Sequence, residues 1–172
     1  MRSRYWLVYA LLVILQVLLG NFLNLGQYVV ICILPLLVFS LPMNLSVAGV
    51  MLIAFATGFA TDFFTHGVLG LSVIPLLPVA FLRKQLLSLV FGGEVFSRGE
   101  SVSVQKQGMP KIALTIVIFT AIYFAIFVWV DAAGTRSIGF NTIRWLLSTL
   151  CSCIVEIPLG RLLAGEEGVR WK

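Results

Sequence analysis

Residues 54–72 read AFATGFATDFFTHGVLGLS and join two apolar segments through a short turn. This stretch places Asp62 inside an apolar run, four residues before His66, the only histidine of the chain. An ionisable residue within an apolar helix is costly, so it indicates either function or close packing. The stretch also concentrates glycine, at Gly58, Gly67 and Gly70.

The composition around this stretch is that of a membrane protein. Of 172 residues, 60% are hydrophobic and only 11% are charged, and the mean hydropathy is +1.05. A soluble domain carries roughly 25% charged residues. At about 20 residues per span, the length allows roughly five or six spans and no separate soluble domain. We therefore predict an all-α membrane protein, a six-transmembrane-helix bundle that forms a single integral membrane domain over residues 1–172.

One of the predicted spans is unusually short. The second holds Pro35 and covers 14 residues, which rise about 21 Å against a hydrocarbon core of about 30 Å. It must be kinked, partly buried among its neighbours or extended at its ends. Near the far end of the fourth span, Arg83 and Lys84 are expected to snorkel to the interface. The predicted spans are residues 5–22, 28–41, 45–64, 68–91, 111–130 and 140–164, and a polar loop covers residues 92–110.

The distribution of basic residues predicts the orientation. With six spans, ten of the 12 Lys and Arg residues fall on the side of the two termini, and only Arg136 and Arg144 fall on the other side. Lys and Arg are retained in the cytoplasm during insertion, so both termini and the 92–110 loop should be cytoplasmic. The net charge of +5 therefore reports topology and does not indicate nucleic-acid binding.

Asp62 continues a stripe of small residues. Gly58 and Ala54 precede it at four-residue intervals, a spacing that lets another helix approach closely. Asp62 should then face protein, either in a structural pair or capping a helix junction. Ligand or proton handling and partner contact are the alternatives. Arg144, at a similar depth in the sixth span, is the predicted partner of Asp62.

The sixth span has a polar stripe of its own, in which Glu156 is the ionisable member that lies deepest. We expect Glu156 to be protonated or paired, inside the bundle or at a subunit interface; a proton or ion site is the alternative. The stripe runs at four-residue intervals through Arg144, Ser148, Ser152, Glu156 and Gly160.

Catalytic patterns are missing from the sequence. Asp62 and His66 are too few to form a metal site, and His66 and Ser72 lie in one turn without a GxSG element. The three cysteines all lie in apolar segments, which favours packing over disulfides or zinc. We expect no catalytic residue, no cofactor and no metal.

The layout resembles MreD, the rod shape-determining membrane protein family of bacteria. The resemblance rests on a second span with Pro35, on G-x-x-x-D at residues 58–62 and on G-x-x-G-L at residues 67–71. It implies a non-catalytic scaffold of the cell-elongation machinery in the bacterial cytoplasmic membrane. The implied partners are a single-pass MreC-like protein and, indirectly, MreB, RodA and its transpeptidase.

The family is similar in architecture to the substrate-binding subunits of energy-coupling-factor transporters, which gives the alternative of a vitamin-type transporter subunit. In the scaffold hypothesis, the stripe of Ala54, Gly58 and Asp62, with the short second span, leaves a groove for a partner helix. Gly67 and Gly70 form the turn that follows. Arg98 and Lys106 in the 92–110 loop are candidate cytoplasmic contacts, or else belong to a solvated connector. A homo-oligomer and contact with membrane lipid are also expected.

Overall fold

A computed structural model of the protein describes residues 2–23, 26–42, 45–65, 68–92 and 109–165. All the regular structure in these ranges is helical, which confirms the all-α class. The helices are α1 (Arg2–Phe22), α2 (Leu34–Ser40), α3 (Val47–Thr65), α4 (Val73–Phe91), α7 (Met109–Ala132) and α8 (Ile138–Gly165).

Five of these helices are long and apolar enough to cross a membrane, which makes this a multi-pass membrane protein. The exception is α2, with seven residues and a length of about 10 Å. The predicted span over residues 28–41 is therefore not a helix throughout. Residues 29–33 carry no helix, and the helix begins only where Pro35 occupies its first turn, a position that needs no amide donor.

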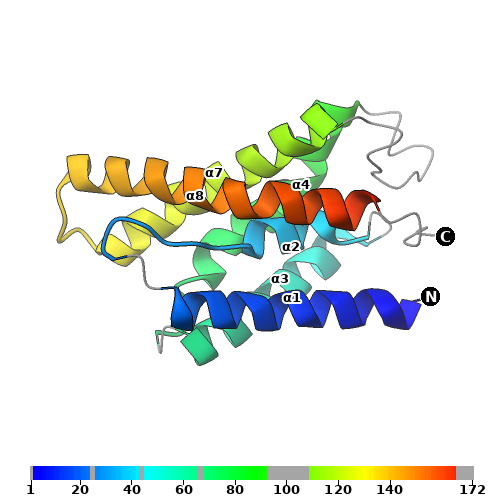
Figure 1. The fold of residues 1–172 in the computed structure, drawn as a ribbon, viewed down its shortest axis with the longest axis horizontal. Coiled ribbons are helices and arrows are strands. Elements are labelled where there is room, and N and C mark those ends of the chain that lie inside the picture. The colour runs from blue at the N-terminus through cyan, green and yellow to red at the C-terminus, as the bar shows by residue number, and fades with distance from the viewer. Residues whose placement is uncertain (1, 24–25, 43–44, 66–67, 93–108, 166–172) are drawn as a thin grey trace.

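The short helix α2 lies in the centre of the bundle. It packs against α1, α3, α4, α7 and α8, and all its residues from Leu34 to Phe39 are buried. Figure 1 shows α2 and the extended chain before it lying between α1 and α8. The sequence prediction that the second span is partly buried among its neighbours is confirmed.

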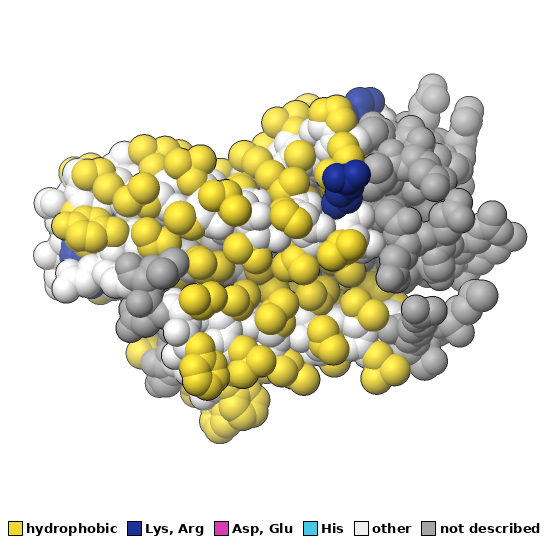
Figure 2. Space-filling view, in the orientation of Figure 1, with side chains coloured by type: hydrophobic (Ala, Val, Ile, Leu, Met, Phe, Trp, Pro, Cys, Tyr) yellow, Lys and Arg dark blue, Asp and Glu magenta, His cyan; other side chains and the backbone are white. Residues whose placement is uncertain are grey.

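The two ends of the bundle are distinguished by the helix ends and turns that lie there. In Figure 1, α1 begins and α8 ends at the same end, and we call this the terminal end. The turn between α7 and α8 lies at the opposite end. Outside the core, the surface is apolar: Figure 2 shows hydrophobic side chains over most of the visible face. This is the surface expected of helices that face lipid.

The small-residue stripe of α3 is used within the chain. Ala54, Gly58 and Asp62 are all buried, and α3 packs against α4. A Cβ added at Gly58 would lie 3.1 Å from Cα of Val73 and 3.2 Å from its backbone nitrogen. The first turn of α4 therefore occupies the place where a partner helix was expected, and the predicted groove along this stripe is wrong.

Replacing Gly58 by alanine tests this close approach. The added methyl group meets backbone atoms of Val73 that have no rotamer to change, so Gly58→Ala should lower the stability by about 1–3 kcal/mol. The measurement is the thermal unfolding midpoint of the purified protein in detergent. Gly139→Ala in α8 is the matched control, because nothing lies within 4 Å of its added Cβ. Equal midpoints for the two variants would contradict the packing.

Candidate functional site

A non-helical backbone runs into the middle of this bundle. The chain before α2 runs as an extended trace (Figure 1), and burial increases along residues 29–33 until Cys32 and Ile33 are 3% and 0% exposed. In apolar surroundings every backbone N–H and C=O needs a partner, and an extended segment cannot supply its own. The partners must come from the helices around it.

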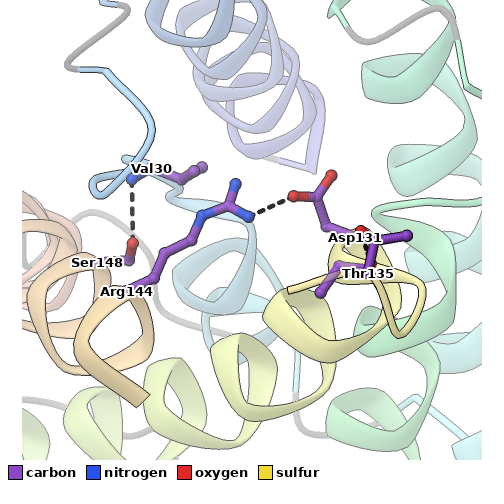
Figure 3. A network of polar contacts seen from close by, with 6 residues as sticks. Val30, Asp131, Thr135, Arg144 and Ser148 are labelled. Atoms are coloured by element: carbon purple, nitrogen blue, oxygen red, sulfur yellow. Dashed lines mark hydrogen bonds and ion pairs between the residues drawn. The ribbon is translucent and has the colours of Figure 1, made fainter. Parts of the chain in front are cut away.

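The polar stripe of α8 supplies one set of partners. The amide of Val30 donates to Oγ of Ser148 at 3.0 Å, and the amide of Cys32 donates to Oγ of Ser152 at 3.0 Å. The Ser152 hydroxyl also donates to the carbonyl of Val30 at 3.4 Å. Figure 3 shows the contact between Ser148 and Val30.

The spacing of the serines on α8 matches the spacing of the amides in the extended chain for a geometric reason. Four residues of helix rise about 6 Å, and two residues of extended chain rise about 6.6 Å. Hydroxyls at Ser148 and Ser152 therefore meet the amides of every second residue, Val30 and Cys32. A serine stripe at four-residue intervals is thus complementary to one edge of an extended chain.

Glu156 continues the stripe at the start of α2. One of its oxygens accepts from the amide of Leu36 at 3.3 Å, and the other makes a short contact with the Thr120 hydroxyl of α7. The first amides of a helix have no partner within it, so a carboxyl group at this place caps α2. From α1, Gln16 accepts from the amide of Ile33 at 2.7 Å. Glu156 is fully buried, so its expected pairing takes place inside the bundle.

The other end of α2 is capped by side chains as well. The guanidinium of Arg83 donates to the carbonyl of Phe39 at 3.4 Å and to that of Leu41, and the Tyr5 hydroxyl donates to the carbonyl of Ser40 at 3.2 Å. Arg83 is 5% exposed. The expectation that it snorkels to the interface is therefore wrong, because the free carbonyls at the end of a short buried helix take its donors.

Asp62 caps the junction between α3 and α4. Its carboxylate accepts from the amide of Gly70 at 2.9 Å and from that of Ser72 at 2.9 and 3.0 Å. Gly70 has a φ of +98°, which suits the turn here. The predicted contact between Asp62 and Arg144 is wrong, because unpaired amides at the start of α4 lie within reach of Asp62.

Arg144 pairs instead with Asp131, across the turn between α7 and α8. Figure 3 shows Nη1 of Arg144 directed at the Asp131 carboxylate. Asp131 lies between the predicted spans 111–130 and 140–164, and the predicted pairing of Arg144 with Asp62 left it out. The signal was the shortness of the link between these spans, which brings the last turn of α7 next to the first turns of α8.

Several residues of the sequence-based site fall outside the part of the chain that the structure describes. These are His66 and Gly67 in the turn after α3, and Arg98 and Lys106 in the polar loop.

Six buried polar side chains therefore bind the backbone of residues 30–41 or of the turn before α4: Gln16, Asp62, Arg83, Ser148, Ser152 and Glu156. In the described ranges no group of three His, Cys, Asp or Glu side chains could hold a metal ion, and the three cysteines are free thiols. Comparisons of the chain with protein-family models, with curated proteins and with solved structures give no match.

Two changes at Glu156 separate a capping role from a charge-carrying role. Glutamine keeps a carbonyl oxygen for the Leu36 amide, and its amide group can donate to Thr120, so Glu156→Gln should change stability by less than about 1 kcal/mol. Glu156→Leu leaves the amide unpaired and should cost about 1–3 kcal/mol. Thermal unfolding in detergent measures both, with Ile154→Leu on the exposed face as control. A glutamine variant as unstable as the leucine variant would contradict capping.

Charge exchange tests the ion pair. Asp131→Arg and Arg144→Asp should each destabilise the hairpin of α7 and α8, and the double variant should recover part of the loss because the pair is restored with opposite signs. The combination of Asp62→Arg with Arg144→Asp should show no recovery, since Asp62 binds backbone amides. Unfolding midpoints of these four variants, and of Asp62→Arg alone, decide the matter. Recovery in the second combination but not in the first would reverse the assignment.

Proposed function

We propose that this chain is a non-catalytic membrane scaffold of the rod shape-determining type, acting in the bacterial cytoplasmic membrane. It would bind a single-pass MreC-like protein and, through it, connect to MreB and the cell-wall synthases. Both termini would then be cytoplasmic. The sequence features at Pro35, at residues 58–62 and at residues 67–71 support this proposal.

One structural observation carries the non-catalytic part of the proposal. Among the described residues, the two buried acids, Asp62 and Glu156, accept hydrogen bonds from backbone amides of the same chain. A carboxylate that donates or takes up protons in a reaction must be reached by substrate or water. These two are 0% exposed and are fixed at helix starts, so they serve the fold.

The surface best suited to a partner helix lies on α1. Only 17% of its membrane-spanning residues are buried, against 28% to 50% for the other four long helices. Its exposed leucine and isoleucine side chains repeat at alternating steps of four and three, which is the spacing of a helix-pairing seam. They are Leu7, Leu11, Ile14 and Leu18, exposed by 46% to 69%.

Photocrosslinking from these positions tests the proposal. A photoreactive amino acid at Leu11 or Ile14 should capture one single-pass membrane protein with an extracytoplasmic domain in native membranes. Ile154 on α8, which is 72% exposed, is the matched control and should capture it several times less. Ala54, Gly58 and Asp62 are unsuitable positions because they are buried against the chain itself.

The outcome distinguishes the scaffold from its rival. Capture of an ATPase-coupling subunit at the α1 positions would favour a transporter subunit and overturn the scaffold. Equal capture of many proteins from α1 and from α8 would show that α1 faces only lipid, and would remove α1 as the docking surface.

A further inference from the structure

A cavity of about 220 Å³ lies beside the extended segment. Residues from five parts of the chain line it, among them Gln16 of α1, Ile31 of the extended segment, Ser72 before α4, Tyr123 of α7 and Arg144 of α8. It therefore lies in the half of the bundle that holds the α7–α8 turn. No role assigned above accounts for it.

The wall formed by the extended segment is an unpaired strand edge. In extended chain, successive residues direct their N–H and C=O groups to opposite sides. Val30 and Cys32 use the side that faces α8, so Val29 and Ile31 direct theirs away from it. Both of these residues line the cavity, both are partly exposed, and their amides make no hydrogen bond with the described residues.

Arg144 adds a buried cation with donors to spare. The residue is 7% exposed, and Nη1 is directed at Asp131. Nε is buried without a hydrogen-bond partner, and Nη2 has none among the described residues. Figure 3 shows that the second terminal nitrogen points away from Asp131. The edge formed by Nε and Nη2 is therefore unused, and a buried donor without an acceptor is costly.

We propose that this cavity binds a small molecule with a carboxylate and a peptide-like amide. The planar edge of Arg144 matches the two oxygens of a carboxylate, as a lysine ammonium does not. The N–H and C=O of Ile31 form the complement of an amide group. The volume lies below the roughly 300 Å³ at which sites for drug-sized ligands begin, so the ligand is about the size of one acylated amino acid. This binding role goes beyond the scaffold.

The first experiment compares two probes with the purified chain in lipid nanodiscs. N-acetylglycine carries both groups, and N-acetylglycinamide lacks only the charge. Saturation-transfer NMR should show binding of N-acetylglycine. N-acetylglycinamide should bind at least about tenfold more weakly, because it cannot form the charge-assisted pair with Arg144. Equal affinities would overturn the assignment of Arg144, and no binding of N-acetylglycine at millimolar concentration would overturn the site.

Three variants separate the site from general electrostatics. Arg144→Gln should lower the affinity for N-acetylglycine by about tenfold or more. Asp131→Asn should raise it severalfold, since the competing carboxylate of the chain is removed while Arg144 stays in place. The control is Arg136→Gln, which changes an exposed cation next to the α7–α8 turn and should leave the affinity unchanged.

If Arg144→Gln does not fold, Ile31→Pro provides a second test of the site, because it removes the amide donor of Ile31. The amide of Ile31 has no partner among the described residues, and proline suits an extended backbone, so the variant should unfold near the wild-type midpoint. It should nevertheless bind N-acetylglycine several times more weakly. An unchanged affinity in both Ile31→Pro and Asp131→Asn would show that neither the strand edge nor the guanidinium takes part, and the proposal would fall.

Discussion

The hydrogen bonds between the serines of α8 and the backbone of residues 30–32 are the contacts on which the rest of the bundle depends. A backbone group left unpaired in hydrocarbon costs several kcal/mol, which is why membranes are crossed by helices and closed barrels. Here the chain before α2 enters the bundle without forming a helix. Ser148 and Ser152 bind the amides of every second residue there, Val30 and Cys32.

The short helix α2 follows from the same constraint. Seven residues are too few for a stable helix on their own. Ordering the first turn costs conformational entropy that its single hydrogen bond does not offset, and a short helix gains few further bonds. Neighbouring helices supply what the helix lacks. A carboxyl group from α8 caps its first turn, and the guanidinium of Arg83 binds its last carbonyls, at the end of the helix dipole that favours a cation. These two side chains, Glu156 and Arg83, therefore lie inside the bundle and do not face the lipid.

Much of the fold could be predicted from composition and periodicity, because the length and hydropathy of a single segment decide whether it can span a membrane. The five long helices, the burial of Asp62 and the polar stripe through Glu156 were all visible in this way. The partners of that stripe were not. Val30 and Cys32 take part through amides that every residue carries, so their side chains give no sign of it. Pairing two charges by depth alone likewise chose Asp62 for Arg144, when chain connectivity favoured Asp131.

The extended segment also fixes its own register, and this ties the cavity to the fold. A slip by one residue would turn the amides of Val30 and Cys32 away from α8 and bring those of Val29 and Ile31 toward it. Two contacts oppose such a slip, because Gln16 binds the amide of Ile33 and Glu156 binds that of Leu36 from different helices. The edge that lines the cavity therefore consists of Val29 and Ile31, whose amides are left unpaired in the described part of the chain when those of Val30 and Cys32 bind α8. Ser148, Ser152 and Glu156 do not line the cavity, yet their contacts help to decide which donors it presents.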